Sequence, residues 1–381
     1  MAERIPVLVT IDTRFVSGPA KGLLQLYRYT SSNVEPRFVL FANRGEATSD
    51  MQRAVEKAGL PVDVLRESFS FDPTLFAQYA RFVMRHGARI VQTHGYKPHV
   101  LGLAARRSLR DVLLRPKVRW IAFHHGWTAE DEKVKRYHAV DAVTLKRADR
   151  VVTVVADGRE KVLAKGVSPE RIAVIPNAVD RSDFGELAGR DVLRARWGMP
   201  ADAPVVSVIG RLSHEKAPDV FLESFALVRR RVPNARAWIV GDGPERQRCE
   251  ERAKQDDLAG SVVFTGHEKQ AASYYEASDV LCIPSRSEQL PNVLLEAMLF
   301  GTPVVSTRVG GVAEVVADGE SAWIVPPEQP ESLANALVHA LSDRNEAAAR
   351  VARAKELVAT RYDARARAAT VEELYKSVLA R

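Results

Sequence analysis

The chain has 381 residues, of which 46% are hydrophobic and 27% are charged. This length corresponds to two or three domains, and the composition excludes a disordered protein and a disulfide scaffold. Cys249 and Cys282 form no C-x-x-C pair, so we expect both to be reduced core residues of a cytosolic chain. No apolar run reaches the roughly 18 residues of a membrane span, and the run within Met1–Ile11 is too short for a signal peptide.

The net charge of +7 lies in the first half of the chain. Residues 1–184 hold 30 Lys and Arg against 20 Asp and Glu, whereas residues 185–381 hold 25 against 28. The densest basic cluster consists of Arg106, Arg107, Arg110, Arg115, Lys117 and Arg119. Such a concentration of positive charge indicates an acidic partner, namely phosphate groups, an anionic membrane surface or nucleic acid. The alternative is an ordinary solvated surface.

Short apolar, β-branched runs alternate with helical patterns along the chain. In the first half the runs are Val7–Ile11, Phe38–Phe41, Val62–Leu65, Ile90–Thr93, Val118–Phe123, Val151–Val155 and Ile172–Ile175. In the second half they are Val205–Ile209, Ala237–Val240, Val262–Thr265, Val280–Ile283, Val304–Ser306 and Trp323–Val325. Near-continuous apolar strands separated by helices predict parallel sheets covered on both faces.

Two such sets predict an α/β protein with two doubly wound domains. The boundary is expected near the turn-rich segment Pro176–Asp180, and the chain from about Pro330 to Arg381 is expected to be helical. Ligands bind at the carboxyl ends of strands in such sheets, so we expect the site in a cleft between the two domains.

The segment from Ser287 to Pro303 carries the first candidate site residues. Pro291 suits a first helical position, and Gly301 and Pro303 suit a helix end. Glu288 then lies just outside a helix N-terminus, where free backbone N–H groups favour an anion, and Glu296 lies about two turns inside. The alternative is a capping charge at Glu288 and a partly buried helix glutamate at Glu296.

A second segment begins where the strand Val205–Ile209 ends. Gly210 permits a tight turn, and Arg211 and Lys216 place two cations on one loop, as suits a diphosphate. Their alternative is surface charge, with Lys216 paired to a nearby carboxylate. The third segment, Gly241-Asp242-Gly243, suits a turn as well as a binding loop.

These segments, in this order, resemble glycosyltransferase family 4. The resemblance rests on the residues Gly210, Arg211, Lys216, Gly241-Asp242-Gly243, Val263–Gly266, Glu288, Glu296 and Gly301-Thr302-Pro303. Glu288 and Glu296 match the family's E-x7-E motif. The family contains retaining enzymes of the GT-B fold, with two Rossmann-like domains, that use nucleotide-diphosphate sugars.

The resemblance implies roles for these residues. Glu288 would bind hydroxyls of the donor sugar, Glu296 the ribose, and Arg211 and Lys216 the diphosphate. The base would lie against the loop after Gly266. The remaining expected donor-site residues are Gly210, Leu290, Pro291 and Asn292. Gln289 stands where the family often has a small residue, which leaves the donor sugar open.

The resemblance also implies a domain plan. Residues 1–184 would form an acceptor-side Rossmann-like domain, and residues 185–361 would bind the nucleotide sugar. A C-terminal helix over about 362–381 would pack back on the first domain.

In the first half, the resemblance places a histidine at a strand end, facing the donor sugar. His125 is the better candidate and His124 the second; the alternative is one buried and one exposed structural histidine. Gly18 matches one glycine of a Gly-Gly loop that lets the diphosphate or the acceptor come close, and we expect it among the donor-site residues; Pro19 stands at the second position of that loop. The next strand end carries His94, Tyr96 and Lys97, which we interpret as acceptor-side residues or as an ordinary polar turn.

The expected reaction is transfer of a sugar to a hydroxyl acceptor with retention of anomeric configuration. No carboxylate can be named as nucleophile, and the resemblance implies front-side attack with the leaving phosphate as base. There is no D-x-D motif and no zinc-ligand spacing, so we expect neither metal nor other cofactor.

Three other functions are weighed against a glycosyltransferase. The first is a nucleotide-sugar epimerase or hydrolase of the same fold. The second is a basic nucleic-acid-binding protein, but no nucleic-acid module or basic-aromatic stripe occurs, so we expect no nucleic-acid partner. The third, a binding module without turnover, is disfavoured because both glutamates accompany the phosphate cations.

The resemblance extends to bacterial enzymes of cell-surface polysaccharide and lipopolysaccharide assembly. Their acceptors imply a lipid-linked or cell-surface glycan here. The basic cluster would then bind anionic headgroups, each Lys or Arg contributing about 1 kcal/mol near the surface. The expected location is cytoplasmic, with peripheral contact at the inner face of the membrane.

Overall fold

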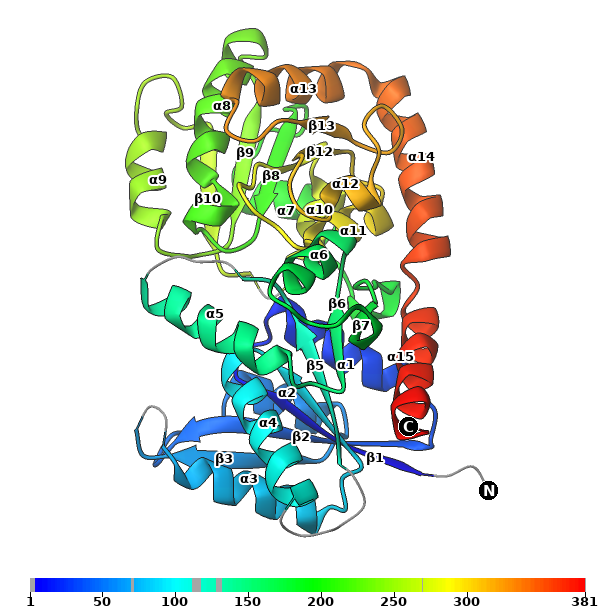
Figure 1. The fold of residues 1–381 in the computed structure, drawn as a ribbon. Helices are drawn as coiled ribbons and strands as arrows, with labels where there is room; N and C mark the ends of the chain where they lie inside the picture. Colours follow the sequence, from blue (N-terminus) through cyan, green and yellow to red (C-terminus); the bar gives the residue numbers. More distant parts are fainter. Residues whose placement is uncertain (1–3, 70–71, 112–117, 128–131, 269, 381) are drawn as a thin grey trace. The chain divides into compact units, whose positions relative to one another are not determined.

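The computed structural model describes residues 4–69, 72–111, 118–127, 132–268 and 270–380 (Figure 1). The chain forms two compact units. The first comprises Met1–Asn177 with Ala364–Arg381, and the second comprises Ala178–Asp363.

A parallel sheet forms the centre of the first unit. Among the described residues it has seven strands, in the order β3-β2-β1-β4-β5-β6-β7. The strands are β1 (Ile5–Ile11), β2 (Val34–Asn43), β3 (Val62–Glu67), β4 (Ile90–His94), β5 (Arg119–His124), β6 (Arg150–Thr153) and β7 (Ile172–Val174). Strand β1 pairs with both β2 and β4, with Val9 opposite Phe38 on one side and Gln92 on the other. The direction of strand order therefore reverses at β1.

Helices cover both faces of this sheet. They are α1 (Gly18–Tyr29), α2 (Asp50–Lys57), α3 (Thr74–Arg85), α4 (Tyr96–Asp111), α5 (Glu132–Leu145), α6 (Ala156–Ala164) and α15 (Ala364–Leu379), with the 3₁₀ turn η1 (Pro169–Arg171). Val7 and Val9 pack into one core with α1, α2 and α15, and Leu8 packs into another with α3 and α4. This alternation is the two-residue period of a strand that is buried on both faces.

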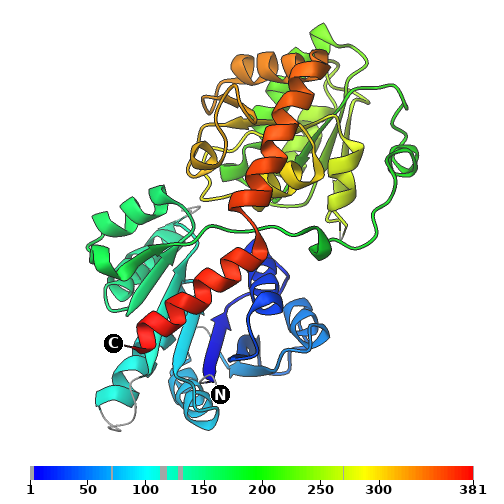
Figure 2. The same cartoon turned by 90° about the vertical axis from the view of Figure 1, so that its right-hand side faces the viewer.

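Helix α15 belongs to the first unit although it ends the chain (Figure 2). Its Ala368, Val371 and Tyr375 are fully buried in the same core as β1 and α1. A helix of the last residues thus contributes side chains to the interior of the N-terminal sheet.

The second unit contains another parallel sheet, with six strands among the described residues in the order β10-β9-β8-β11-β12-β13. The strands are β8 (Val205–Ile209), β9 (Arg236–Val240), β10 (Val262–Gly266), β11 (Val280–Ile283), β12 (Val304–Thr307) and β13 (Trp323–Val325). Strand β8 lies between β9 and β11. The order therefore reverses at β8, as it does at β1.

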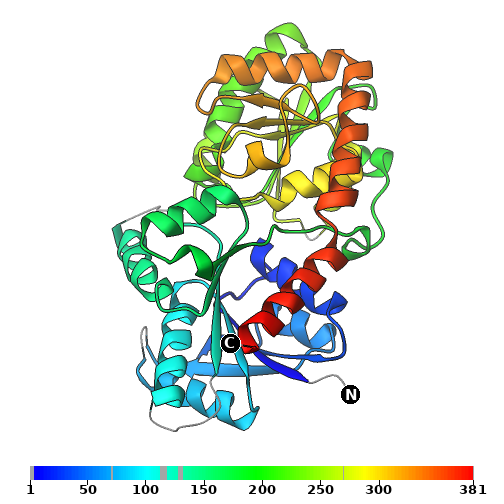
Figure 3. The same cartoon turned by 45° about the vertical axis from the view of Figure 1, so that its right-hand side comes forward.

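Helices again lie on both faces of the second sheet (Figure 3). They are α7 (Arg190–Arg196), α8 (Pro218–Arg231), α9 (Arg246–Ala253), α10 (Ala272–Ala277), α11 (Asn292–Phe300), α12 (Val312–Val315), α13 (Pro330–Ser342) and α14 (Arg344–Arg361), with 3₁₀ turns η2 (Arg181–Asp183) and η3 (His214–Lys216). Cys249 and Cys282 are buried free thiols, as predicted, and burial raises the pKa of Cys249 to about 12.

Every strand predicted from the sequence is present. The differences are at the ends, as at β2, which begins at Val34 rather than Phe38. The expected helix start at Pro291 is wrong by one residue, because Pro291 precedes α11 with an extended backbone. Glu296 consequently lies about one turn inside that helix rather than two. No helix in the described parts of the chain has the length and apolar character needed to cross a membrane.

Candidate functional site

The reversal of strand order at β8 defines an edge of the second sheet where two loops meet. The loop Gly210–Ala217 follows β8, and the loop Pro284–Pro291 follows its neighbour β11. In open parallel sheets, this point outside the strand carboxyl ends is where ligands bind. The first two segments that the sequence singled out in the second half therefore lie together.

Close backbone packing holds the loop after β8 in place. The amide of Gly210 donates to the carbonyl of Val240 (2.9 Å), and that of Leu212 donates to Asp242 (2.9 Å). A Cβ at Gly241 would lie 1.9 Å from the Gly210 oxygen, and one at Gly243 would lie 2.2 Å from the Leu212 oxygen. Gly241-Asp242-Gly243 thus supports the neighbouring loop by permitting this approach.

Lys216 and Glu288 form the polar centre of the edge. The Lys216 ammonium donates to both carboxylate oxygens of Glu288, at 2.6 and 2.8 Å. The Ser285 hydroxyl donates to Glu288 Oε1 (2.7 Å), and Thr307 in turn donates to the Ser285 carbonyl (2.6 Å). The Glu288 side chain is 7% exposed and that of Lys216 31% exposed. The carboxylate is therefore fixed by two partners, while the Lys216 side chain remains partly exposed.

Glu296 lies on α11, behind this centre. It is 8% exposed, and the Tyr275 hydroxyl donates to its Oε2 (2.6 Å). Burial and the nearby carboxylate raise the pKa of Tyr275 well above its ordinary value, so the hydroxyl keeps its proton and orients Glu296. This geometry suits a carboxylate that accepts hydrogen bonds from a hydroxyl-bearing ligand.

The other expected donor-site residues lie around the same sheet edge. Arg211 is exposed, directly after Gly210. Gly266 ends β10, and its carbonyl accepts the amide of Gly241 (2.8 Å). Leu290 and Pro291 are buried, and Asn292 is the first residue of α11. Gly210, Arg211, Lys216 and Glu288 also line a small cavity of about 20 Å³.

Sequence reasoning missed Arg286, which connects the two loops. Its guanidinium donates to both oxygens of Asp219 (3.0 and 2.8 Å) and to Glu328 (2.9 Å). It also donates to the carbonyl of His214 in η3 (2.9 Å). Burial alone would raise the pKa of Asp219, but hydrogen bonds and charge from Arg286 hold it below its ordinary value. Arg286 therefore fixes the loop after β11 against the loop after β8.

Gly310 is the second residue that sequence reasoning missed. Its φ is +50°, and a Cβ there would lie 1.8 Å from the Glu288 carbonyl oxygen. The next residue, Gly311, donates its amide to the Gln289 carbonyl (2.7 Å). The only signal in the sequence is a Gly-Gly pair shortly after a strand. This close approach sets the backbone position of Glu288.

Gly310→Ala is expected to destabilise the second unit by more than about 2 kcal/mol, because a strained φ and a backbone collision add. Gly319→Ala is the matched control. Gly319 also has a positive φ, +79°, but a Cβ there meets nothing within 4 Å. The control should lose only about 1 kcal/mol. Urea unfolding curves measure both losses, and equal losses would contradict the packing role of Gly310.

In the first unit, His94 and His125 lie at adjacent strand ends. His94 Nδ1 and His125 Nε2 are 2.9 Å apart, and the two rings are nearly parallel, with an interplanar angle of 21° and centroids 5.2 Å apart. Burial is the main cause that lowers the pKa of His94 well below its ordinary value and that of His125 to about 3. Both imidazoles are therefore neutral at pH 7. His94 is buried, whereas His125 is partly exposed.

His124, the second histidine candidate, lies in a different environment. It is 3% exposed, and its Nδ1 lies 3.7 Å from Asp141. Asp141 also pairs with His99 (2.6 Å) and accepts from the Trp127 indole (2.9 Å). The structure thus separates the two neighbours, with His124 in a buried cluster and His125 at the sheet edge.

The depressed pKa values predict a pH-dependent stability. The unfolded chain binds protons at His94 and His125 below about pH 6.5, and the folded chain does not. The two neutral imidazoles therefore contribute fully to the free energy of unfolding above that pH. This contribution is lost as the pH falls toward the folded-state pKa. The free energy of unfolding should fall by up to about 1.4 kcal/mol per pH unit for each histidine. Urea unfolding between pH 7 and 5 should show a shallower dependence in His125→Asn than in the wild type; parallel curves would contradict the shift.

The remaining first-unit candidates surround the reversal at β1. Lys97 pairs with Glu67 (2.6 Å), lies 3.7 Å from Asp12 and sits 4.3 Å from the Phe41 ring centre. Burial raises the pKa of Asp12 despite the lysine charge. Asp12 and Glu67 were missed as candidates, although one follows β1 directly and the other ends β3.

Tyr96 and Gly18 complete the set of first-unit candidates. Tyr96 is 38% exposed and stacks on Tyr137 with ring centroids 4.7 Å apart. Gly18 is the first residue of α1. The structure therefore places Gly18, Tyr96 and Lys97 at the starts of helices that follow strands.

The basic cluster is partly neutralised in the structure. Arg106 donates two hydrogen bonds to Asp149 (3.1 and 3.2 Å), and Arg119 lies 3.7 Å from the same carboxylate. Arg107 is exposed. Arg115 and Lys117 lie outside the described residues, as does the side chain of Arg110.

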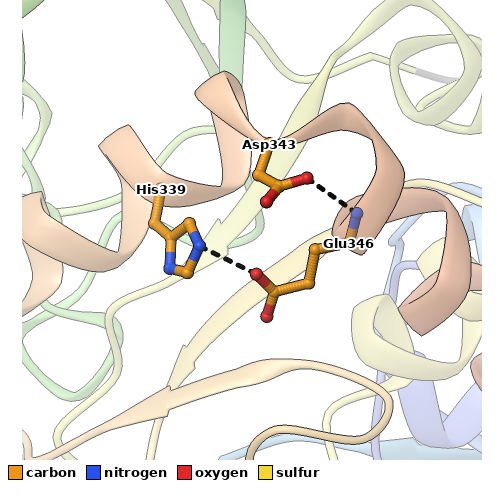
Figure 4. Close-up of side chains that lie close together, drawn as sticks. All are labelled: His339, Asp343 and Glu346. Carbon is orange, nitrogen blue, oxygen red and sulfur yellow. Dashed lines mark hydrogen bonds and ion pairs between the residues drawn. The ribbon is translucent and has the colours of Figure 1, made fainter.

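His339, Asp343 and Glu346 form the one group of potential metal ligands among the described residues (Figure 4). Asp343 accepts the backbone amide of Glu346 (2.9 Å), and thereby caps α14. Glu346 pairs with His339 (2.8 Å) and accepts from Arg350 (2.9 Å). Helix capping and ion pairing thus account for the cluster.

Comparison with known proteins finds a family model that matches each of the two units. The model of "Glycosyltransferase Family 4" matches residues 16–183, and that of "Glycosyl transferases group 1" matches residues 189–357. A "D-inositol 3-phosphate glycosyltransferase" of Saccharomonospora viridis is 31% identical over 299 residues, which cover 68% of this chain and 69% of the relative. The chain belongs to glycosyltransferase family 4.

A second relative, from Corynebacterium urealyticum, carries the same name. It is 34% identical over 219 residues, covering 55% of this chain and 51% of the relative. The chain thus spans only about half the length of some curated relatives that it matches.

Solved structures show the fold. Anabaena Alr3699/HepE in complex with UDP-glucose matches with a TM-score of 0.86 at 20% identity, covering 98% of this chain and 100% of that one. WaaG, "a glycosyltransferase involved in lipopolysaccharide biosynthesis", matches with a TM-score of 0.73 at 17% identity, covering 97% and 99%. Together with the two parallel sheets, these matches confirm the predicted GT-B fold with two Rossmann-like domains.

Proposed function

We propose that the protein transfers a sugar from a nucleotide-diphosphate sugar to a hydroxyl acceptor, with retention of anomeric configuration. The observation that carries this proposal is the Lys216–Glu288 pair at the strand-order reversal of the second unit. Family membership and a structural neighbour bound to UDP-glucose support it.

The donor would bind at the β8–β11 edge. Arg211 and Lys216 supply positive charge for the diphosphate, and this charge stabilises the leaving group as its own negative charge grows. Glu288 would accept hydrogen bonds from sugar hydroxyls, because Ser285 and Lys216 already fix its carboxylate. Glu296, oriented by Tyr275, would accept from the ribose. Gly210, Gly266 and Leu290–Asn292 would form the surrounding wall.

His125 would donate a hydrogen bond to a substrate hydroxyl as a neutral imidazole, since burial keeps its pKa far below 7. His94, Tyr96 and Lys97 would lie on the acceptor side, and Gly18 would let the donor diphosphate come close. With the diphosphate charge balanced by Arg211 and Lys216, we expect no metal requirement, and activity should persist in EDTA.

Two chemical classes of acceptor fit this proposal. The family resemblance and the basic first half favour a lipid-linked or cell-surface glycan at the inner face of the membrane. The names of the two relatives favour a phosphorylated polyol. Asp149 neutralises part of the basic cluster, so a membrane role would depend on Arg107 and the basic residues beyond it. Co-sedimentation with anionic vesicles at low salt would favour the glycan acceptor at the membrane, and its absence would favour the phosphorylated polyol.

The experiment is a thermal-shift and product screen against UDP-, GDP-, ADP- and TDP-sugars, with and without a candidate acceptor. One donor should stabilise the protein and release nucleoside diphosphate, and the anomeric proton of the product should show the configuration of the donor. Conversion without acceptor would indicate the epimerase or hydrolase instead. No response to any donor would contradict the proposal.

A further inference from the structure

A chain of buried hydrogen bonds runs from the C-terminal helix to His125. The Tyr375 hydroxyl, on α15, donates to Oε1 of Gln92 on β4. Gln92 Nε2 lies 2.9 Å from His94 Nε2, and His94 Nδ1 lies 2.9 Å from His125 Nε2. Gln92 is fully buried and Tyr375 is 0% exposed, so water does not compete for these groups.

The direction of this chain follows from its first bond. Because Oε1 of Gln92 accepts from Tyr375, its amide NH₂ faces His94 and donates to Nε2. A neutral histidine that accepts at Nε2 carries its proton at Nδ1. His94 therefore donates from Nδ1 to Nε2 of His125. By the same rule, His125 carries its proton at Nδ1.

We propose that Tyr375, Gln92 and His94 are positioning residues that hold His125 in the Nδ1–H tautomer, so that the ring nitrogen left for a ligand is a hydrogen-bond donor. The use of that donor rests on the proposed function of His125. The tautomer itself does not, because it follows from contacts within the first unit.

Neighbouring groups reinforce the neutral state of the chain. The Tyr375 hydroxyl donates its only proton to Gln92. Tyr27 must therefore be the donor in the hydrogen bond between the Tyr27 and Tyr375 hydroxyls (2.9 Å). Arg367, also on α15, is buried and donates to the Gly22 carbonyl (2.8 Å). After burial and the neighbouring imidazoles, its charge further lowers the pKa of His94 and His125.

Ring packing fixes the orientation of the His94 imidazole. The His94 ring lies nearly parallel to Phe123, with centroids 4.8 Å apart and an interplanar angle of 24°, and nearly parallel to His125, with centroids 5.2 Å apart and an angle of 21°. A 180° flip of the His94 ring would put Cδ2 and Cε1 in the places of Nδ1 and Nε2, and would break both hydrogen bonds. The packing therefore keeps both ring nitrogens of His94 in the hydrogen-bond chain.

The test pairs two tyrosine variants of the full chain. Tyr375→Phe removes the donor that orients Gln92, so the amide can turn and both histidine tautomers become accessible. Tyr79→Phe is the matched control, because Tyr79 is a buried tyrosine of the same unit whose hydroxyl bonds Thr10 (2.7 Å) and not Gln92. Two-bond ¹H–¹⁵N correlation spectra of ¹⁵N-histidine-labelled protein report which ring nitrogen carries the proton, with His94→Asn and His125→Asn assigning the signals.

The wild type and Tyr79→Phe should show His125 protonated at Nδ1, and Tyr375→Phe should show a mixture. With the donor and acceptor in hand, kcat should fall about tenfold in Tyr375→Phe, the scale of one hydrogen bond, with little change in the donor KM. If Tyr375→Phe does not fold, Gln92→Met, which lacks the amide donor, should give the same mixture.

Protonation of wild-type His125 at Nε2 would overturn the proposal. Identical tautomers and kcat values in the two tyrosine variants would overturn it too, because they would reduce Tyr375 to a packing residue. A tautomer that responds as expected, together with unchanged turnover in His125→Ala, would instead contradict only the role of His125 in the proposed function.

Discussion

Lys216→Ala is expected to lower turnover by a factor of about 10²–10³, the usual effect of removing one group that stabilises charge developing in the transition state. Lys216 is the partly exposed cation beside the fixed carboxylate of Glu288. A diphosphate leaving group at this edge would contact the Lys216 side chain directly. Arg211→Ala should act in the same direction, since Arg211 lies on the same loop. Steady-state release of nucleoside diphosphate measures both effects.

Arg248→Ala is the matched control for these two variants. It also removes one positive charge from the second unit, but its side chain is 74% exposed on α9, 3.7 Å from Glu245. Its turnover should equal that of the wild type. Because Lys216→Ala leaves Glu288 buried without its counter-ion, circular dichroism should first show that the variant is folded. Near-normal turnover in both Lys216→Ala and Arg211→Ala would refute the donor assignment.

Glu288→Gln should lower kcat/KM for the donor by roughly 10- to 150-fold, the range of one hydrogen bond to a charged group. The amide keeps the size of the side chain and one acceptor for Ser285. However, it removes the negative charge that Lys216 and a sugar hydroxyl would share, and it turns an NH₂ toward the ammonium. The loss should appear mainly with sugar donors, and binding of the free nucleoside diphosphate should change much less.

Glu223→Gln provides the comparison for this substitution. Glu223 is a half-exposed carboxylate on α8 that pairs with Arg252 (2.6 Å), so the change also breaks an ion pair in the second unit. It should leave donor kinetics unchanged. Equal weakening of donor and free nucleotide in Glu288→Gln would place Glu288 on the nucleotide rather than on the sugar.

The strands were predictable because both sheets are buried on two faces. A strand such as Val205–Ile209 must then be almost continuously apolar, and the polar residues that follow it mark the carboxyl end. The loops carrying Arg211, Lys216 and Glu288 could therefore be assigned to strand ends from local sequence. Their meeting at one edge follows from the reversal at β8, which doubly wound topology requires.

The parts that the sequence did not predict depend on contacts between distant residues. Gly310 matters because its backbone approaches Glu288, and Arg286 matters because it reaches Asp219 and Glu328. No local pattern records such approaches. The hydrogen-bond chain from Tyr375 to His125 is hidden for the same reason, since it joins the last helix to two N-terminal strands.

Hydrogen–deuterium exchange, with and without the nucleoside diphosphate that stabilises the protein most, can locate the bound nucleotide. We propose that the nucleotide binds at the β8–β11 edge of the second unit. We predict that ligand slows exchange in peptides covering residues 209–216 and 284–296 in the wild type, and that Lys216→Ala abolishes this protection. Protection elsewhere, with these two loops unchanged in the presence of bound nucleotide, would contradict the account.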